Sequence, residues 1–260
     1  MSLRSDAQSI ISASIRAVQP DAAVQRALQG REFPGRVVLA AAGKAAWQMA
    51  KAARDCLGDR ISAGVVVTKY GHVSGPIPGC TCYEAGHPVP DENSFQGAQA
   101  VLDLVSGLTE QDTVIFLLSG GGSALFEKPL VPGEELQDVT SQLLSSGADI
   151  VEMNTIRKRL SAVKGGRFAQ LCAPARVFAI VLSDILGDPL DMIASGPACA
   201  DQSTCEQALA VAEKYRLTLT PRAKELLAQE TPNARDNVAT QITGSVRELC
   251  AAAASAARHL

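Results

Sequence analysis

Short apolar runs rich in Val, Ile, Leu and Ala alternate along this chain with longer segments of helix-forming residues. Alternation of this kind is typical of βαβ units, in which helices cover a parallel sheet. The predicted strands are residues 36–41, 64–68, 81–84, 113–118 and 176–182. The predicted helices are residues 45–57, 94–106, 134–146, 149–162, 205–215 and 244–260. The sequence therefore predicts an α/β fold: a Rossmann-like, doubly wound and mostly parallel sheet with helices on both faces, in a three-layer sandwich.

Four of the five predicted strands are almost continuously apolar, as expected for strands that are buried on both faces. Residues 81–84 are more polar, so we expect this strand at an edge of the sheet. No repeat, charge block or low-complexity linker divides the chain. We therefore expect a single domain over residues 1–260.

Charge and hydropathy exclude several classes of partner. The 24 basic and 27 acidic residues give a net charge of −3, which offers no general attraction for nucleic acid or an anionic membrane. No window reaches the roughly 18 apolar residues of a membrane span, and the N-terminus lacks a signal peptide, so we expect a cytoplasmic protein. The seven cysteines contain no CxxC pair, which favours reduced thiols over disulfides or a zinc site.

Polar and glycine-rich segments directly follow four of the predicted strands. In open parallel sheets, ligands bind beyond the carboxyl ends of the strands, so we expect these segments to share one cleft. They are residues 42–44, 69–72, 119–123 and 183–188.

The segment Ser119-Gly120-Gly121-Gly122-Ser123 is the strongest candidate for an anion-binding loop. Three successive glycines can present a row of backbone N–H groups, and a helix starting near Ser123 would add its positive end. The alternative is a tight turn needed only for packing the helix on the strand. Neither common nucleotide fingerprint fits: Leu125 stands where G-x-G-x-x-G needs glycine, and Val38 and Ala45 break the Walker pattern at Gly43-Lys44.

Lys44, Asp184 and Asp188 are candidates for catalysis. Lys44 follows a buried strand at the start of a predicted helix, where its ammonium group can reach a phosphate. Asp184 and Asp188 lie in a loop after the fifth strand, where carboxylates can bind Mg²⁺ or accept a hydroxyl proton. The alternatives are an ordinary surface lysine and aspartates that form turns or cap a helix.

Residues 154–167 and 84–94 contain candidates for binding an acidic substrate. Asn154, Arg157 and Lys158 share a helix face at spacings of three and four, so they can clamp a carboxylate or a phosphate. A solvated basic face would show the same spacing. His87 lies in a proline-stiffened loop and is a candidate acid–base residue, although the sequence identifies no fixed partner for it.

Six segments in order resemble one known family. They are AAAGKAAWQMAKA, TKYGH, EAGHPVPDENS, LLSGGGSALF, NTIRKRLSAVKGGRFA and LSDILGDPLDMIASGPACADQST. Together they resemble the N-terminal domain of the class II glycerate kinases, which are ATP- and Mg²⁺-dependent and phosphorylate D-glycerate, commonly to 2-phosphoglycerate. Some members of that family carry the name hydroxypyruvate reductase.

The resemblance also implies roles for individual residues. Lys44 corresponds to the active-site lysine and residues 119–123 to the phosphate-contacting loop, while Asp184 and Asp188 become the metal and base candidates. Asn154, Arg157 and Lys164 would line the cleft. Family members continue into a C-terminal MOFRL domain that contributes an arginine, and we expect that domain to be absent from this chain, which would leave the chain nearly inactive by itself.

Two other functions remain open at this point. An NAD(P)H-dependent hydroxypyruvate reductase needs a dinucleotide fingerprint in its first βα turn, where this chain has Ala42-Gly43-Lys44. A non-catalytic domain that binds a phosphorylated ligand needs the glycine loop and basic groups but neither aspartate. We expect a small-molecule partner, glycerate, with no nucleic acid and no membrane; a homodimer is compatible with the sequence.

Overall fold

A computed structural model describes residues 2–183, 185–232 and 236–260. Its centre is a six-stranded sheet of order β3-β2-β1-β4-β5-β6, in which each neighbouring pair is parallel. The strands are β1 (Val37–Ala42), β2 (Ile61–Lys69), β3 (Cys80–Ala85), β4 (Thr113–Leu118), β5 (Arg176–Leu182) and β6 (Val238–Thr243). The predicted fold class and the five predicted strands are confirmed, and β6 is an addition.

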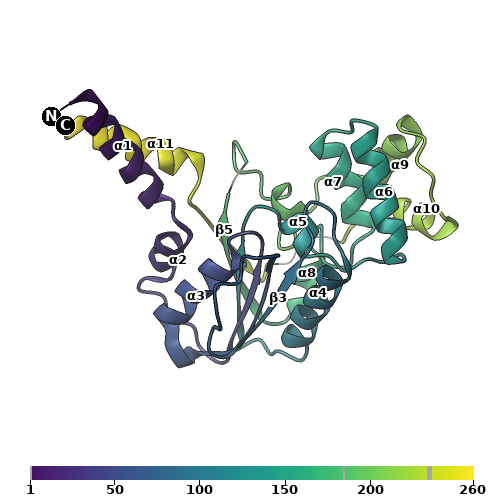
Figure 1. The fold of residues 1–260 in the computed structure, drawn as a ribbon. Helices are drawn as coiled ribbons and strands as arrows, with labels where there is room; N and C mark the ends of the chain where they lie inside the picture. The colour runs from purple at the N-terminus through teal and green to yellow at the C-terminus, as the bar shows by residue number, and fades with distance from the viewer. Residues whose placement is uncertain (1, 184, 233–235) are drawn as a thin grey trace.

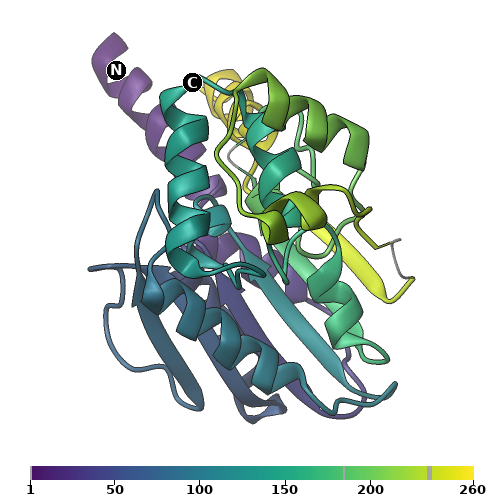
Figure 2. The same ribbon diagram turned by 90° about the vertical axis from the view of Figure 1, so that its right-hand side faces the viewer.

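Helices cover both faces of this sheet (Figures 1 and 2). One face packs on α2 (Pro20–Leu28) and α3 (Ala46–Leu57), and the other packs on α4 (Glu92–Val105) and α8 (Arg167–Cys172). Successive residues of β1 alternate between the two cores, because side chains of a strand point to opposite faces in turn. All six residues of β1 are buried, which explains its continuous apolar sequence.

Four helices form a layer beside the sheet, on the right in Figure 1. They share a separate apolar core, to which α7 contributes Ile156. The helices are α6 (Gly133–Ser145), α7 (Ile150–Arg159), α9 (Cys205–Lys214) and α10 (Pro221–Leu227). The Asp149 side chain caps α7 by accepting from the N–H groups of Val151 and Glu152, which fixes where this helix begins.

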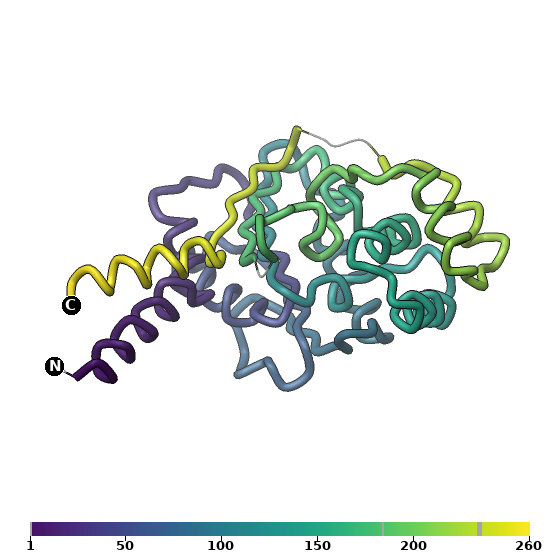
Figure 3. Tube along the Cα trace, turned by 90° about the horizontal axis from the view of Figure 1, so that it is seen from above, coloured from purple at the N-terminus to yellow at the C-terminus, as the bar shows by residue number. Residues whose placement is uncertain are grey.

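The first and last helices, α1 (Leu3–Ala17) and α11 (Val246–Arg258), lie side by side and project away from the sheet (Figures 1 and 3). The predicted C-terminal helix is therefore present, and its partner α1 was not predicted. No helix within the described residues is long and apolar enough to cross a membrane.

The strand order places a topological switch point between β1 and β4. The chain runs from β1 outward to β2 and β3, and then returns to β4 and continues in the opposite direction to β5 and β6. Loops that follow the two central strands diverge at such a point and leave a crevice, which is where doubly wound proteins bind ligands. The segments after β1 and β4 are Gly43-Lys44 and the glycine loop 119–123. Strand β3 lies at the edge, as its polar sequence predicted.

Candidate active site

The turns after β1 and β4 hold each other in place. The Lys44 N–H donates to the carbonyl of Gly120 at 2.9 Å, and the Ala45 N–H donates to the Ser119 hydroxyl at 3.0 Å. Gly43 has φ of +123°, and a Cβ there would overlap the Ser119 hydroxyl and lie 2.5 Å from the Ser119 carbonyl oxygen. Glycine at position 43 is therefore a requirement of this close approach.

Gly121 lies where two of the predicted site residues meet. It has φ of +85°, and a Cβ built on it would lie 3.0 Å from His87 Cδ2 and 3.1 Å from Lys44 Cγ. These side chains come from the loops that follow β3 and β1, so three loops converge on the glycine. The fold thus brings together Lys44, His87 and Gly121, which lie up to 77 positions apart in the sequence.

The surroundings of Gly121 carry an excess of positive charge. Burial lowers the pKa of His87, and the charges of Lys44, Lys69 and Arg157 lower it further. Among the residues that the structure describes, none of these three cations forms an ion pair. Several cations around a glycine loop attract an anion. Lys69, the last residue of β2, belongs to the segment 69–72 that was predicted to share the cleft, although no individual role was predicted for it.

The pKa of the His87 imidazole reports directly on the positive charge around Gly121. We expect this pKa to lie below 6.5 in the free protein and to rise when inorganic phosphate binds, because the anion offsets the neighbouring cations. The unfolded chain then binds the proton more readily than the folded one, so this residue lowers stability as the pH falls from about 6.5. An NMR titration of the three histidines with and without phosphate measures both effects.

His259 is the internal control for that titration, because it ends α11, the helix that projects away from the sheet with α1 (Figure 3). Its resonances should not respond to phosphate. A His87 pKa above 6.5, or one that phosphate leaves unchanged, would contradict the assignment of an anion site beside it.

A second set of contacts ties the glycine loop to α7. The hydroxyl oxygens of Ser123 and Ser195 lie 3.1 Å apart, and the Ser195 hydroxyl donates to the Asn154 amide oxygen at 2.7 Å. Ser195 is buried and has φ of +61°, a left-handed conformation that costs energy in a residue with a Cβ. Ala194 shares this strain with φ of +51°, and its Cβ would lie 2.7 Å from one added at Gly122. Ser195 was not predicted from the sequence.

The cations of α7 and the residues after it differ in their partners. The Lys158 ammonium is 2.8 Å from Asp201 and 3.4 Å from Asp191, so it is neutralised within the fold and does not share the anion-clamping role that its helix face suggested. Lys164 is fully buried, 2.8 Å from a Glu127 carboxylate oxygen and 2.8 Å from the Phe126 carbonyl. Arg157 is the exception, with two guanidinium nitrogens that lack a partner among the described residues.

Comparison with known proteins gives the family. The profile of a family described as a domain of unknown function, DUF4147, matches residues 6–228. The chain belongs to the DUF4147 family. A D-glycerate 2-kinase from Thermotoga maritima is 55% identical over 260 residues, which cover 99% of this chain and 62% of that relative. A relative from Agrobacterium vitis is 47% identical over 75% of this chain and 51% of its own length, and carries a provisional hydroxypyruvate reductase name.

The crystal structure of a glycerate kinase from Thermotoga maritima is similar to this DUF4147 chain, with a TM-score of 0.93 and 54% sequence identity. The match covers 99% of this chain and 62% of that chain. These findings confirm the resemblance of the six motifs to the class II glycerate kinases and confirm the fold. The chain spans about 62% of the length of these Thermotoga relatives.

The aspartates after β5 are only partly described in this DUF4147 chain. Asp184 lies outside the described residues. Asp188 is half-buried in a turn, where its N–H donates to the Ile185 carbonyl at 3.2 Å, and it has φ of +54°. Its carboxylate forms no hydrogen bond or ion pair within the described part of the chain. Asp191, three residues further on, has its carboxylate beside Lys158.

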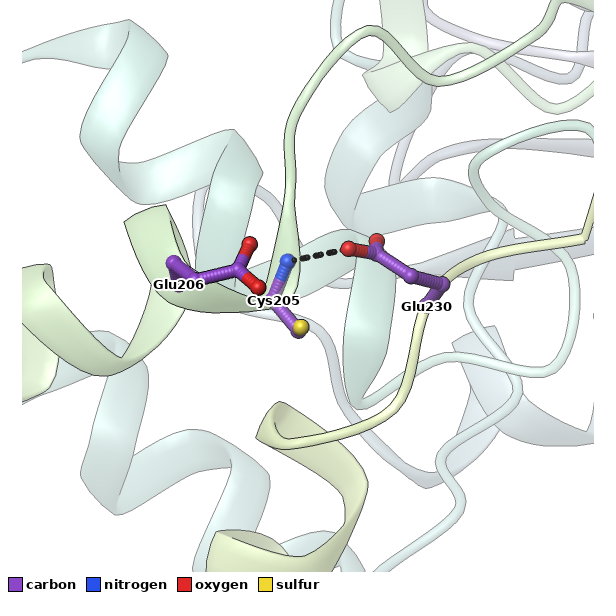
Figure 4. Close-up of side chains that lie close together, drawn as sticks. All are labelled: Cys205, Glu206 and Glu230. Atoms are coloured by element: carbon purple, nitrogen blue, oxygen red, sulfur yellow. Dashed lines mark hydrogen bonds between the residues drawn. The ribbon is translucent and has the colours of Figure 1, made fainter.

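One other group of metal-ligand residue types in the described part of the chain lies together, at the start of α9 (Figure 4). Ligand atoms of Cys205, Glu206 and Glu230 all fall within 4.8 Å of one another. Glu230 accepts from the Cys205 N–H at 2.9 Å and pairs with Arg159 at 3.0 Å. A hydrogen bond to Glu230, with burial and the charge of Glu206, raises the pKa of the Cys205 thiol, which disfavours the thiolate that a metal needs. The proximity of these three residues is therefore explained by the hydrogen bond at the start of α9 and by the ion pair of Glu230 with Arg159 of α7.

Proposed function

We propose that this domain binds ATP and D-glycerate and transfers the γ-phosphoryl group directly, in line, to the 2-hydroxyl of glycerate. The observation that supports this proposal is the convergence of Lys44 and His87 on Gly121 in a surplus of positive charge. Phosphoryl transfer needs positioning and neutralisation of charge more than any covalent participation of the protein. The similarity to a D-glycerate 2-kinase indicates the acceptor.

In this proposal, the glycine loop and Lys44 stabilise the group being transferred. Backbone N–H groups of residues 119–123 and the Lys44 ammonium would face the phosphoryl oxygens, where negative charge spreads in the transition state. The hydrogen bonds from the N–H groups of Lys44 and Ala45 to Gly120 and Ser119 hold the loop and the lysine in a fixed relation. Fixed donors need little rearrangement during the reaction, which is why such a loop accelerates it.

Asp188 is the described residue that fits a Mg²⁺ ligand. Its carboxylate has no partner within the described residues and is only half-buried, so its oxygens are free to bind a hard cation. Asp184 is proposed to share this role or to accept the hydroxyl proton of the acceptor. A bound Mg²⁺ would supply charge neutralisation on the phosphate oxygens.

The two alternatives differ in what they require. A nicotinamide-dependent reductase needs a glycine-rich dinucleotide turn after β1, and this chain has Gly43-Lys44 bonded to the β4 loop instead. The variant Asp188→Asn separates a kinase from a non-catalytic binding domain. Both would keep their affinity for phosphate, but a kinase would lose phosphoryl transfer.

Parallel assays of the intact gene product test the proposal. One contains ATP, Mg²⁺ and D-glycerate, and the other contains NADH and hydroxypyruvate. We expect ADP and a phosphoglycerate in the first and no oxidation of NADH in the second. Oxidation of NADH without release of ADP would refute the kinase.

A further inference from the structure

One edge of the Arg157 guanidinium is buried and unused by the fold. The residue is 6% exposed, and its Nε and Nη2 atoms have no hydrogen-bond partner among the described residues. These two nitrogens lie on the same side of the planar group and point their N–H bonds in parallel. That pair of donors matches the two oxygens of a carboxylate in a bidentate interaction.

The buried charges around Arg157 do not balance. Arg157, Lys164 and Glu127 provide two cations and one carboxylate, and Glu127 lies 2.8 Å from Lys164. Lys164 is therefore the cation that Glu127 pairs with directly, while the same carboxylate acts on Arg157 through its charge without forming an ion pair. A buried cation without an ion pair of its own is costly, so a fold that keeps one has a reason to do so.

Arg157 lies beside the proposed reaction site. Its charge acts on His87, whose ring packs against the position of Gly121. One turn earlier on α7, Asn154 accepts a hydrogen bond from Ser195, which in turn contacts Ser123 of the glycine loop. Arg157 thus lies on the helix that contacts the glycine loop, and its charge reaches His87.

We propose that the Nε and Nη2 atoms of Arg157 bind the carboxylate of the acceptor acid, so that the site selects hydroxy acids over neutral polyols. This inference rests on the proposed function and assigns its substrate specificity. The glycine loop and Lys44 are left to the phosphate groups, whose tetrahedral oxygens suit a backbone nest and a point charge. The charge of Glu127 favours the charged form of the guanidinium.

Binding measurements test the proposal without requiring turnover. For Arg157→Lys, which keeps the charge and loses the paired donors, we expect the affinity for D-glycerate to fall about tenfold or more in calorimetric titrations. The affinity for ADP should stay within a factor of about two. Discrimination between D-glycerate and glycerol should fall by the same factor as the affinity for glycerate.

Arg159 is the matched control, because it is a fully buried arginine on the same helix that is paired with Glu230, Ser203 and Asp201. Arg159→Lys should leave the affinity for D-glycerate unchanged. The methionine variants give a second readout. Without ligand, Arg157→Met should raise the midpoint of thermal unfolding, because it removes an unpaired buried charge, whereas Arg159→Met should lower it.

Three results would overturn the inference: unchanged affinity of Arg157→Lys for D-glycerate, a loss of affinity for ADP in its place, or a lowered unfolding midpoint of Arg157→Met. The second would place a nucleotide phosphate on this edge. Failure of the proposed function is distinguishable from these, since a protein that binds D-glycerate through Arg157 but releases no ADP refutes the kinase and leaves the carboxylate site. A wild-type protein that binds no D-glycerate refutes both.

Discussion

Replacing Lys44 by alanine is expected to lower kcat for phosphoryl transfer by about 10²- to 10³-fold, the usual effect of removing one donor that faces developing charge. The Lys44 side chain packs against the position of Gly121, and its backbone N–H is bonded to Gly120. The substitution removes the ammonium and leaves that backbone bond in place. The loss should therefore appear in the rate of transfer and not in the stability of the fold, as measured by a coupled ADP assay and urea unfolding.

Lys51 provides the control for this variant. It lies on the exposed part of α3 and pairs with Asp55 at 2.6 Å, an interaction typical of a helix surface. Lys51→Ala should keep the full rate. Turnover by Lys44→Ala at the wild-type rate would remove Lys44 from the proposed mechanism.

Replacing Gly43 by alanine should have the largest effect on the fold. A Cβ at this position meets both the hydroxyl and the backbone of Ser119, so the turns after β1 and β4 must separate. Overpacking against backbone and the loss of a glycine-only conformation together should lower the free energy of unfolding by about 3–4 kcal/mol. Transfer should be lost as well, because the loop no longer holds its relation to Lys44.

The variant Gly71→Ala separates the overpacking against Ser119 from the conformational cost of replacing a glycine. Gly71 has φ of +76° and nothing within 4 Å of a Cβ placed on it. Gly71→Ala should therefore carry only the conformational cost, about 1–2 kcal/mol in urea unfolding. If the free energy of unfolding falls by the same amount in both variants, the contact with Ser119 contributes nothing to the effect of Gly43→Ala.

The sheet could be predicted because its central strands are buried on both faces and therefore nearly all apolar. Residues 113–118 and 176–182 were predicted with the bounds that the structure has. Strand β6 was missed because Val238–Thr243 is a mixed polar sequence that is mostly accessible at the edge. The first helix α1 was missed, and Ser14 is the one buried residue along it, so it has no apolar face packed on the sheet.

The convergence of Lys44 and residues 119–123 could be predicted, because both segments directly follow central strands of the sheet. What the sequence could not show is which cations the fold neutralises. Lys158 and Arg157 are adjacent on α7, yet the partner of Lys158 is Asp201, 43 positions further on. Ser195 was hidden for the same reason, since its role depends on contacts with Ser123 and Asn154 across the fold.

The most direct test of the account follows the backbone amides of the glycine loop by NMR while Mg²⁺ and ADP are added. We predict saturable shifts at Gly120, Gly121 and Gly122 together with the His87 ring, and weaker binding in Lys44→Ala. Binding of ADP that shifts other amides and leaves residues 119–123 unchanged, or no binding of ADP at all, would contradict the central claim that this loop holds the phosphate.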